Sequence, residues 1–226
     1  MSKHKAIIDD GCNPELVAGA RFEGIMEMPV IEPPKHIFIP QMIVPFSERN
    51  RCPDPRNSAV AFFENDIEFA EILRDPAAYV DDLRRFGAII SPDCSLYRNA
   101  PLPVQVTNVY RNRAVGSYYQ RRGAYVITLV RWGNPLSYTT AYFPEKLAFL
   151  GAPKRSILAI SPYGCIQTRE DKFYFAEGLG EMISELEPEV VLVYGSMPEK
   201  VFAPYKGRTK FVFFPDWTSL VHGGDH

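Results

Sequence analysis

Three reactive side chains, Asp93, Cys94 and Ser95, follow one another at the end of a short apolar segment, residues 88–92. They supply a carboxylate, a thiol and a hydroxyl where a buried strand is expected to end. A second carboxylate, Asp216, lies at the end of the last apolar segment. Two carboxylates that meet across the rim of a sheet can act as general acid and general base, so Asp93 and Asp216 are the candidate catalytic residues. Cys94 needs an electropositive setting to react, and we expect it to pack beneath the loop instead.

Arginine and tyrosine dominate the segment that follows. Between Cys94 and Pro144 the sequence has no aspartate, glutamate or lysine, but it has the arginines Arg98, Arg111, Arg113, Arg121, Arg122 and Arg131. Guanidinium groups bind phosphate in a bidentate manner, and a mixture of basic and aromatic residues is typical of nucleotide or single-strand binding. The alternative is that these arginines pair with the acidic segment 64–85, which would make them structural.

The predicted ligand-binding residues lie on the arginine-rich segment or at the ends of strands: Ser95, Arg98, Arg111, Arg113, Arg131, Trp132, Tyr163 and Tyr194. Ligands collect at the carboxyl ends of the strands in parallel sheets. We expect arginines 111, 113 and 131 to hold phosphate, and Trp132 and Tyr163 to stack on a ring. Loops after strands are also rich in serine and aspartate for turn formation alone, so each residue has a structural explanation as well.

Apolar strands alternate with helical segments from residue 59 onward. Strands are expected at 60–63, 88–92, 124–132, 156–164, 190–196 and 210–217, and helices at 64–85 with a break at Pro76, 103–123, 144–151 and 169–188. Strands that are apolar throughout are buried on both faces, which favours a mainly parallel sheet surrounded by helices. We therefore predict an α/β fold of about six strands with short helices, similar to a partial or distorted βα barrel. The alternative is an open doubly wound sheet.

Residues 1–58 are punctuated by prolines, which disfavour long helices. We expect this region to be an arm packed on a single α/β domain that spans residues 1–226. Within the arm, the apolar segment 36–46 has the composition of one or two short strands or of an extended apolar arm.

Composition narrows the class of protein. The 226 residues are 46% hydrophobic, which is enough for a buried core, and the net charge of −2 favours no class of partner. No segment reaches the roughly 20 consecutive apolar residues that cross a membrane. The polar start, without an apolar signal core, predicts a cytoplasmic protein with free thiols and no membrane partner. The oligomeric state stays open.

Motifs that would identify a cofactor or a metal are missing from the sequence. It has no phosphate-binding loop, no dinucleotide fingerprint after a strand and no HExxH motif. The four cysteines are widely spaced and the histidines lie near the ends of the chain, so neither a zinc ribbon nor a histidine-based triad is expected. The final HGGDH can bind a metal adventitiously through His222, Asp225 and His226, but we interpret it as a tail. We predict no cofactor and no metal site.

The segment SPDCSLYRNAPLPVQVTNVYRNRAVGSYYQRRGAYVITLVRW, residues 91–132, resembles a bacterial, plasmid and phage family known as domain of unknown function 4417. The shared features are an SPDxSxYR start, an NxYRNRxxGxYxQ helix and a strand that ends in tryptophan, and the resemblance extends over residues 28–196. The sequence departs from the pattern at Cys94, where the family has an aromatic residue, and at Arg131, where it has a small polar one. The first departure argues against an obligatory nucleophile at Cys94. The resemblance implies a mobile-element setting and no particular activity.

Three functional hypotheses follow from the sequence. The leading one is a protein of a mobile element that binds a nucleotide or a nucleic-acid end at the rim of the sheet, with hydrolytic or transfer chemistry as an option. The second is a non-catalytic module that binds a host protein through the proline-rich arm and exposed aromatic side chains. The third is an enzyme that acts on a small molecule without nucleic acid.

Overall fold

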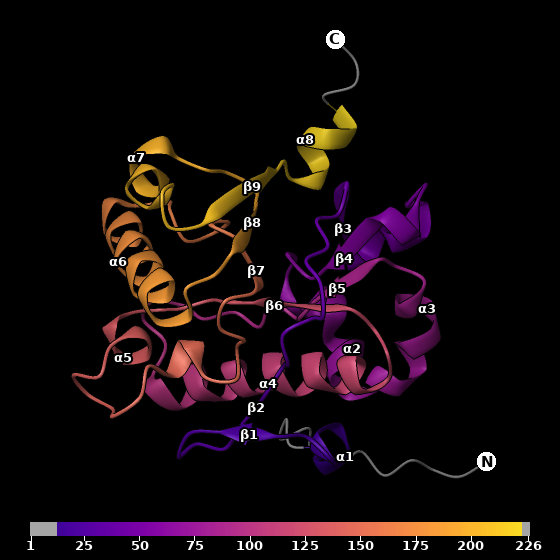
Figure 1. Cartoon of the computed structure of the whole chain (residues 1–226), viewed down its shortest axis with the longest axis horizontal. Helices are drawn as coiled ribbons and strands as arrows, with labels where there is room; N and C mark the ends of the chain where they lie inside the picture. The colour runs from indigo at the N-terminus through magenta and orange to yellow at the C-terminus, as the bar shows by residue number, and fades with distance from the viewer. Residues whose placement is uncertain (1–12, 223–226) are drawn as a thin grey trace.

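A parallel sheet of seven strands forms the centre of the molecule (Figure 1). The computed structural model of the chain describes residues 13–222. The strands of the sheet are β3 (Met42–Pro45), β4 (Ser58–Ala61), β5 (Ala88–Ile90), β6 (Val126–Leu129), β7 (Ile157–Ile160), β8 (Val190–Tyr194) and β9 (Lys210–Phe214). Two short strands before them, β1 (Phe22–Glu23) and β2 (Met28–Pro29), pair as an antiparallel hairpin.

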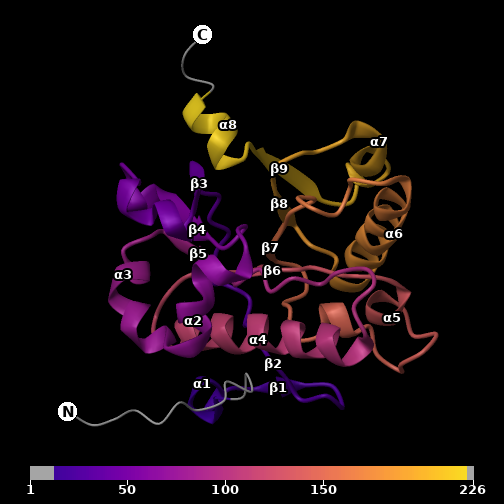
Figure 2. The ribbon, with the colours of Figure 1, turned by 180° about the vertical axis from the view of Figure 1, so that it is seen from behind.

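The helices surround the sheet. Figures 1 and 2 show α4 crossing below the strands, α6 and α7 beside β7 to β9, and α2 and α3 beside β3 to β5. The bounds are α1 Pro14–Val17, α2 Ala70–Arg74, α3 Val80–Arg84, α4 Leu102–Arg121, α5 Pro135–Tyr138, α6 Arg169–Leu186, α7 Glu199–Phe202 and α8 Trp217–His222. Short 3-10 turns connect them: η1 Phe46–Arg51, η2 Pro55–Asn57, η3 Asp66–Phe69, η4 Pro76–Tyr79, η5 Leu147–Phe149 and η6 Ala203–Tyr205.

The order of the seven strands in space is the same as their order along the chain. Right-handed crossovers that always advance in one direction place their helices on one face of the sheet. The sheet then curls around its other face, as in a βα barrel. A doubly wound sheet would require a reversal of strand order, and the described strands have none. The chain is therefore a curled half-barrel, and the barrel-like prediction is confirmed over the doubly wound alternative.

The strands alternate their side chains between the two faces of the sheet. Ala61 and Phe63 belong to the cluster on the concave face, whereas Val60 and Phe62 pack toward the helices. Phe63 stacks on Tyr194 at the end of β8, with ring centroids 4.6 Å apart. β4 and β8 are not neighbours in the sheet, so this contact reflects the curvature of the half-barrel.

Helix α4 is buried between two layers, the sheet on one side and the segment with α1 and β2 on the other. The absence of a side chain at Gly116 allows this close packing, because a Cβ there would lie 2.4 Å from Ile31 Cδ1. The described part of the N-terminal segment therefore covers α4. It also contributes β3, so the sheet has one strand more than the sequence predicted.

Two long helices lie where they were expected, at residues 102–121 and 169–186. The predicted helix at 64–85 is instead a series of short turns, η3, α2, η4 and α3. Proline lacks a main-chain donor, so Pro76 interrupts the helix. The side chain of Asp75 accepts a hydrogen bond from Ala78 N and begins a new turn there.

Candidate functional site

A cleft of about 740 Å³ lies at the carboxyl ends of β4, β5, β6 and β7. Its walls come from residues of the segments 63–67, 93–99, 131–133 and 163–175. This is the end of a parallel sheet at which ligands collect. The cleft brings together six of the predicted site residues: Asp93, Ser95, Arg98, Arg131, Trp132 and Tyr163. The other four, Arg111, Arg113, Tyr194 and Asp216, are not among its lining residues.

A buried ion pair between Asp93 and Arg131 forms the floor of the cleft. Arg131 Nε lies 2.5 Å from Asp93 Oδ1, and Arg131 Nη2 donates to Asp93 Oδ2 at 2.5 Å. Burial raises the pKa of the Asp93 carboxyl, and the attraction of Arg131 opposes this shift. Arg131 Nη1 also donates to Cys165 Sγ at 3.3 Å. Arg131 is thus engaged by protein groups on two sides, and a bound phosphate would have to compete with Asp93.

Helix α4 holds the loop that carries Asp93. Asn112 Nδ2 donates to the carbonyl oxygen of Pro92 at 2.6 Å, and Asn108 Nδ2 donates to that of Ser95 at 2.6 Å. Ser91 Oγ donates to Asn112 Oδ1 and accepts from Leu129 N, which joins β5, β6 and α4. Our sequence interpretation of the YRNR helix considered its arginines and tyrosines. The signal that it missed is two asparagines four residues apart, and therefore on one helix face.

Arg113 is a structural residue at the centre of α4. It is 2% exposed, and it donates to the carbonyl oxygens of Leu129, Ala148 and Leu150 and to Asn112 Oδ1. Burial lowers its pKa to about 10. The arginine therefore faces neither the acidic segment 64–85 nor the cleft. Arg111, on the same helix, is half-buried outside the cleft lining.

Two further contacts cross the walls of the cleft. Ser95 Oγ donates to Asp66 Oδ1 at 2.8 Å. Arg98 forms ion pairs with Glu170 and Asp171 in the first turn of α6, and its Nε lies 2.9 Å from Asp171 Oδ1. Asp171 also forms a capping box with Thr168, which lowers the pKa of its carboxyl. The 93–99 loop is thus tied to both neighbouring walls.

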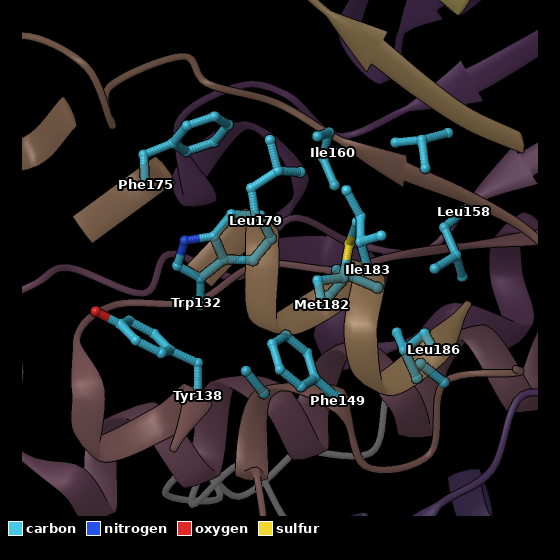
Figure 3. Packing of buried hydrophobic residues seen from close by; sticks show 14 of the residues in the cluster. Trp132, Tyr138, Phe149, Leu158, Ile160, Phe175, Leu179, Met182, Ile183 and Leu186 are labelled. Atoms are coloured by element: carbon cyan, nitrogen blue, oxygen red, sulfur yellow. The ribbon is translucent and has the colours of Figure 1, made fainter. Parts of the chain in front are cut away.

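The aromatic residues predicted to stack differ in their accessibility. Trp132 is 5% exposed and packs among Phe149, Phe175 and Leu179 in the cluster between the sheet and α6 (Figure 3). Its ring lies so close to α6 that a Cβ on Gly178 would be 2.3 Å away. Tyr163, by contrast, is 68% exposed and lines the cleft. Tyr163 is therefore the ring that a ligand can reach.

Two of the predicted residues have local structural partners. Tyr194 stacks on Phe63, and its hydroxyl accepts a hydrogen bond from Trp217 N at 2.8 Å. Asp216 accepts from Ser219 N at 2.9 Å and from Ser219 Oγ at 2.7 Å, so its carboxylate caps helix α8. These hydrogen bonds lower the pKa of Asp216. A role for Asp216 in acid–base chemistry with Asp93 stays a prediction.

The charged side chains of the cleft are all engaged by protein groups, and its carboxylates outnumber its guanidinium groups. Its four carboxylates and two guanidinium groups all have partners within the described residues: Glu64 with Ser47, Asp66 with Ser95, Asp93 with Arg131, and Asp171 with Arg98. Other polar side chains of the lining have no hydrogen-bond partner among residues 13–222: Asn65, Asn99, Gln167, Tyr97 and Tyr163. The unengaged hydrogen-bonding capacity of the cleft is therefore neutral and partly aromatic.

The cysteines of the site are not set up as nucleophiles. Cys94 is 3% exposed, and burial raises the pKa of its thiol. Cys165 lines the cleft, and burial raises its pKa as well. Within residues 13–222, no group of three or more histidine, cysteine, aspartate or glutamate residues could hold a metal ion. Asp225 and His226 of the predicted adventitious metal site lie outside the described residues.

Comparison with known families gives a match over residues 20–215 to the family described as Domain of unknown function (DUF4417). The chain belongs to this family. The resemblance inferred from the SPDxSxYR and YRNR segments is thereby confirmed.

Two phage proteins are similar to the chain. It is 32% identical over 173 residues to "Gene 1 protein" of Mycobacterium phage L5, which covers 76% of this chain and 72% of the phage protein. It is 31% identical over 139 residues to "Gene 1 protein" of Mycobacterium phage D29, which covers 62% of this chain and about half, 49%, of that protein. The chain is therefore a phage-associated α/β protein. No solved structure matches it.

None of the helices within residues 13–222 is both long and apolar enough to cross a bilayer.

Proposed function

We propose that the cleft binds the nucleoside part of a nucleotide or of a nucleic-acid end, with the phosphate group at the mouth beside Arg98. The observation that carries this proposal is the difference between the paired and the unengaged groups of the cleft. The charges on its floor are neutralised by each other, whereas exposed tyrosines and side-chain amides have no partner within residues 13–222.

Each part of a nucleoside has a counterpart in this set of residues. Tyr163 and Tyr97 are 68% and 65% exposed and offer ring faces on which a base can stack. The amides of Asn65, Asn99 and Gln167 carry both donors and acceptors, which suit ribose hydroxyls and base edges. These groups recognise neutral polar rings without requiring a free cation in the cleft.

Fewer arginines are free to bind the phosphate than the sequence suggested. Arg113 is engaged by main-chain carbonyls, and Arg131 is engaged by Asp93. The side chain of Arg98 is 39% exposed, and an incoming phosphate can replace Glu170 as its partner. Arg98 is therefore the phosphate ligand in this proposal.

Hydrolytic or transfer chemistry stays a prediction, with Asp93 as its proton-transfer group. The carboxyl lies on the floor of the cleft, and burial raises its pKa, which suits a general acid. The alternative of a host-protein-binding module also stays a prediction.

Calorimetric titration of the protein with the four ribonucleosides and their 5′-monophosphates tests the proposal. We expect binding of both series. Tyr163→Ala should weaken binding of both about tenfold or more, because stacking on an aromatic ring contributes roughly 1–3 kcal/mol per base. Arg98→Ala should weaken only the monophosphates, and Arg98→Lys should restore part of that loss.

The matched control is Arg155→Ala. Arg155 is also an exposed, ion-paired arginine, bound to Glu187, but it precedes β7 at the opposite end of the sheet. This variant should leave the affinity unchanged. The proposal is wrong if neither series binds to the unmodified protein, or if the Arg155 variant loses as much affinity as the Arg98 variant.

A further inference from the structure

Arginines gather at the end of the sheet opposite the cleft. Arg56 precedes β4, Arg84 precedes β5, and Arg121 and Arg122 precede β6. All four residues are exposed. The three strands are parallel neighbours, and neighbouring strands lie about 4.8 Å apart, so the four arginines share one edge of the half-barrel. We call the surface formed by these four residues the arginine end.

The residues of the arginine end have no counter-charge within the described part of the chain. None of the four is within ion-pair distance of a carboxylate of residues 13–222, whereas Arg85, beside them, pairs with Asp82. Both cleft arginines are paired, as described above. The arginine end is therefore uncompensated within the described residues, whereas the arginines of the cleft are not.

Local contacts fix the side chains of Arg121 and Arg122, and Arg84 lies beside them. Arg122 stacks over the ring of Tyr118, with its guanidinium carbon 3.4 Å from the ring centroid. Arg121 donates to Ser117 Oγ and to the carbonyl oxygen of Leu16. Arg84 Nη2 lies 3.8 Å from the position that a Cβ would take on Gly123, next to Arg122.

Like charges held this close repel each other, and the repulsion is relieved when an anion binds between them. The guanidinium groups of Arg56 and Arg84 have no hydrogen-bond partner among residues 13–222, and that of Arg122 has only the face of Tyr118. Guanidinium groups present planar forks of donors that match phosphate oxygens, and arginine retains its charge at all working pH values. A row of such groups across three strands suits a row of phosphates.

We propose that the arginine end binds the phosphate backbone of a nucleic acid. The contacts are to phosphates, so recognition is independent of base sequence. The site is separate from the cleft, and the inference does not depend on the function proposed for the cleft. The chain would then have one surface that binds a nucleic-acid strand and a separate cleft that binds a single nucleotide.

The test measures how salt weakens binding of a fluorescein-labelled oligonucleotide of about 20 nucleotides, single-stranded and as a duplex, because each neutralised phosphate steepens that dependence. Fluorescence anisotropy gives the affinity. If four phosphates of the single strand are neutralised, the affinity should fall about 50-fold between roughly 50 mM and 200 mM salt. The affinity of the double variant Arg84→Gln/Arg122→Gln should fall only about sevenfold over the same range of salt, because this variant makes two phosphate contacts fewer.

The control is Arg51→Gln/Arg155→Gln, which removes two exposed arginines that are already ion-paired, with Glu48 and Glu187. It should keep the salt dependence of the unmodified protein. The inference is overturned if the unmodified protein binds neither oligonucleotide at the lowest salt, or if the Arg84/Arg122 variant keeps the full salt dependence. It is also overturned if the control variant loses as much of the salt dependence as the Arg84/Arg122 variant.

Urea unfolding midpoints of the variants confirm that each is folded. Nucleosides bind only at the cleft, so their titration with the Arg84/Arg122 variant distinguishes failure of this inference from failure of the proposed function.

Discussion

The ion pair between Asp93 and Arg131 is the most deeply buried pair of opposite charges described here, with side chains 6% and 15% exposed. A buried pair of this kind contributes little net stability, because desolvation of the two ions offsets their attraction. Removing one partner, in contrast, destabilises the fold strongly, because the remaining charge is then buried without compensation. The pair therefore fixes the geometry of the cleft floor more than it stabilises the fold.

At this residue scale we expect Asp93→Asn to lower the free energy of unfolding by about 3–5 kcal/mol, the usual cost of breaking a buried ion pair. Arg131→Met alone should be similarly costly, because it leaves the Asp93 carboxylate unpaired. The double variant Asp93→Asn/Arg131→Met should recover much of the loss. Urea unfolding of the four proteins gives the coupling energy directly. Additive losses in the double variant would show that the two side chains do not act as a pair.

At the scale of elements, α8 depends on its first residues for stability. The helix has only six residues. In its first turn, the N–H and the hydroxyl of Ser219 both donate hydrogen bonds to the Asp216 carboxylate. The pKa of Asp216 is lowered in the folded chain by these hydrogen bonds. The contribution of the cap is therefore present above the ordinary pKa of aspartate and is lost as the pH falls through the lowered value.

We expect Asp216→Ala to weaken α8 by about 1 kcal/mol, the usual effect of removing an N-cap side chain. Amide hydrogen exchange at Leu220, whose N–H donates to the carbonyl oxygen of Asp216, should become faster. Asp216→Asn keeps an acceptor and should retain most of the protection, and it should remove the acid-dependent part of the exchange. Unchanged exchange in the alanine variant would mean that the cap does not hold the helix.

Several elements were predictable from the sequence because local rules determine them. The long helix 102–121 follows Pro101 and is succeeded by Gly123, and apolar runs mark most of the strands. The cleft residues that follow β5, β6 and β7 were predicted from the rule that ligands collect at strand ends. The roles of Arg113 and Asn112 were not predictable, because each depends on carbonyl oxygens from distant segments that only the folded chain brings together. A short strand was one interpretation of residues 36–46, but the sequence did not indicate that β3 would join the central sheet.

At the scale of the whole molecule, curvature brings together strands that the sheet order keeps apart. The Phe63–Tyr194 contact joins the ends of β4 and β8 across the concave face, with the rings 13° from parallel. The same face is filled by small and branched side chains such as Ala59, Ala159 and Ile127. Small residues allow the sheet to curl closely, and the two rings fill the space near the cleft.

We expect a coupling energy of about 0.5–1.5 kcal/mol between Phe63→Leu and Tyr194→Leu in a double-mutant cycle measured by urea unfolding, as is usual for aromatic pairs in contact. The matched control is the cycle of Phe63→Leu with Phe211→Leu, since Phe211 packs in the other cluster on the outer side of the sheet. That cycle should be additive within about 0.5 kcal/mol. Additivity in the first cycle would contradict the curled arrangement.

The identity between strand order in space and strand order along the chain has a consequence for how the protein is made. Chains emerge from the ribosome with the N-terminus first. Each new strand from β4 to β9 pairs with the strand that was synthesised just before it. None of these strands, β4 to β9, has to wait for a partner that is still inside the ribosome, so the half-barrel can extend one βα unit at a time during translation.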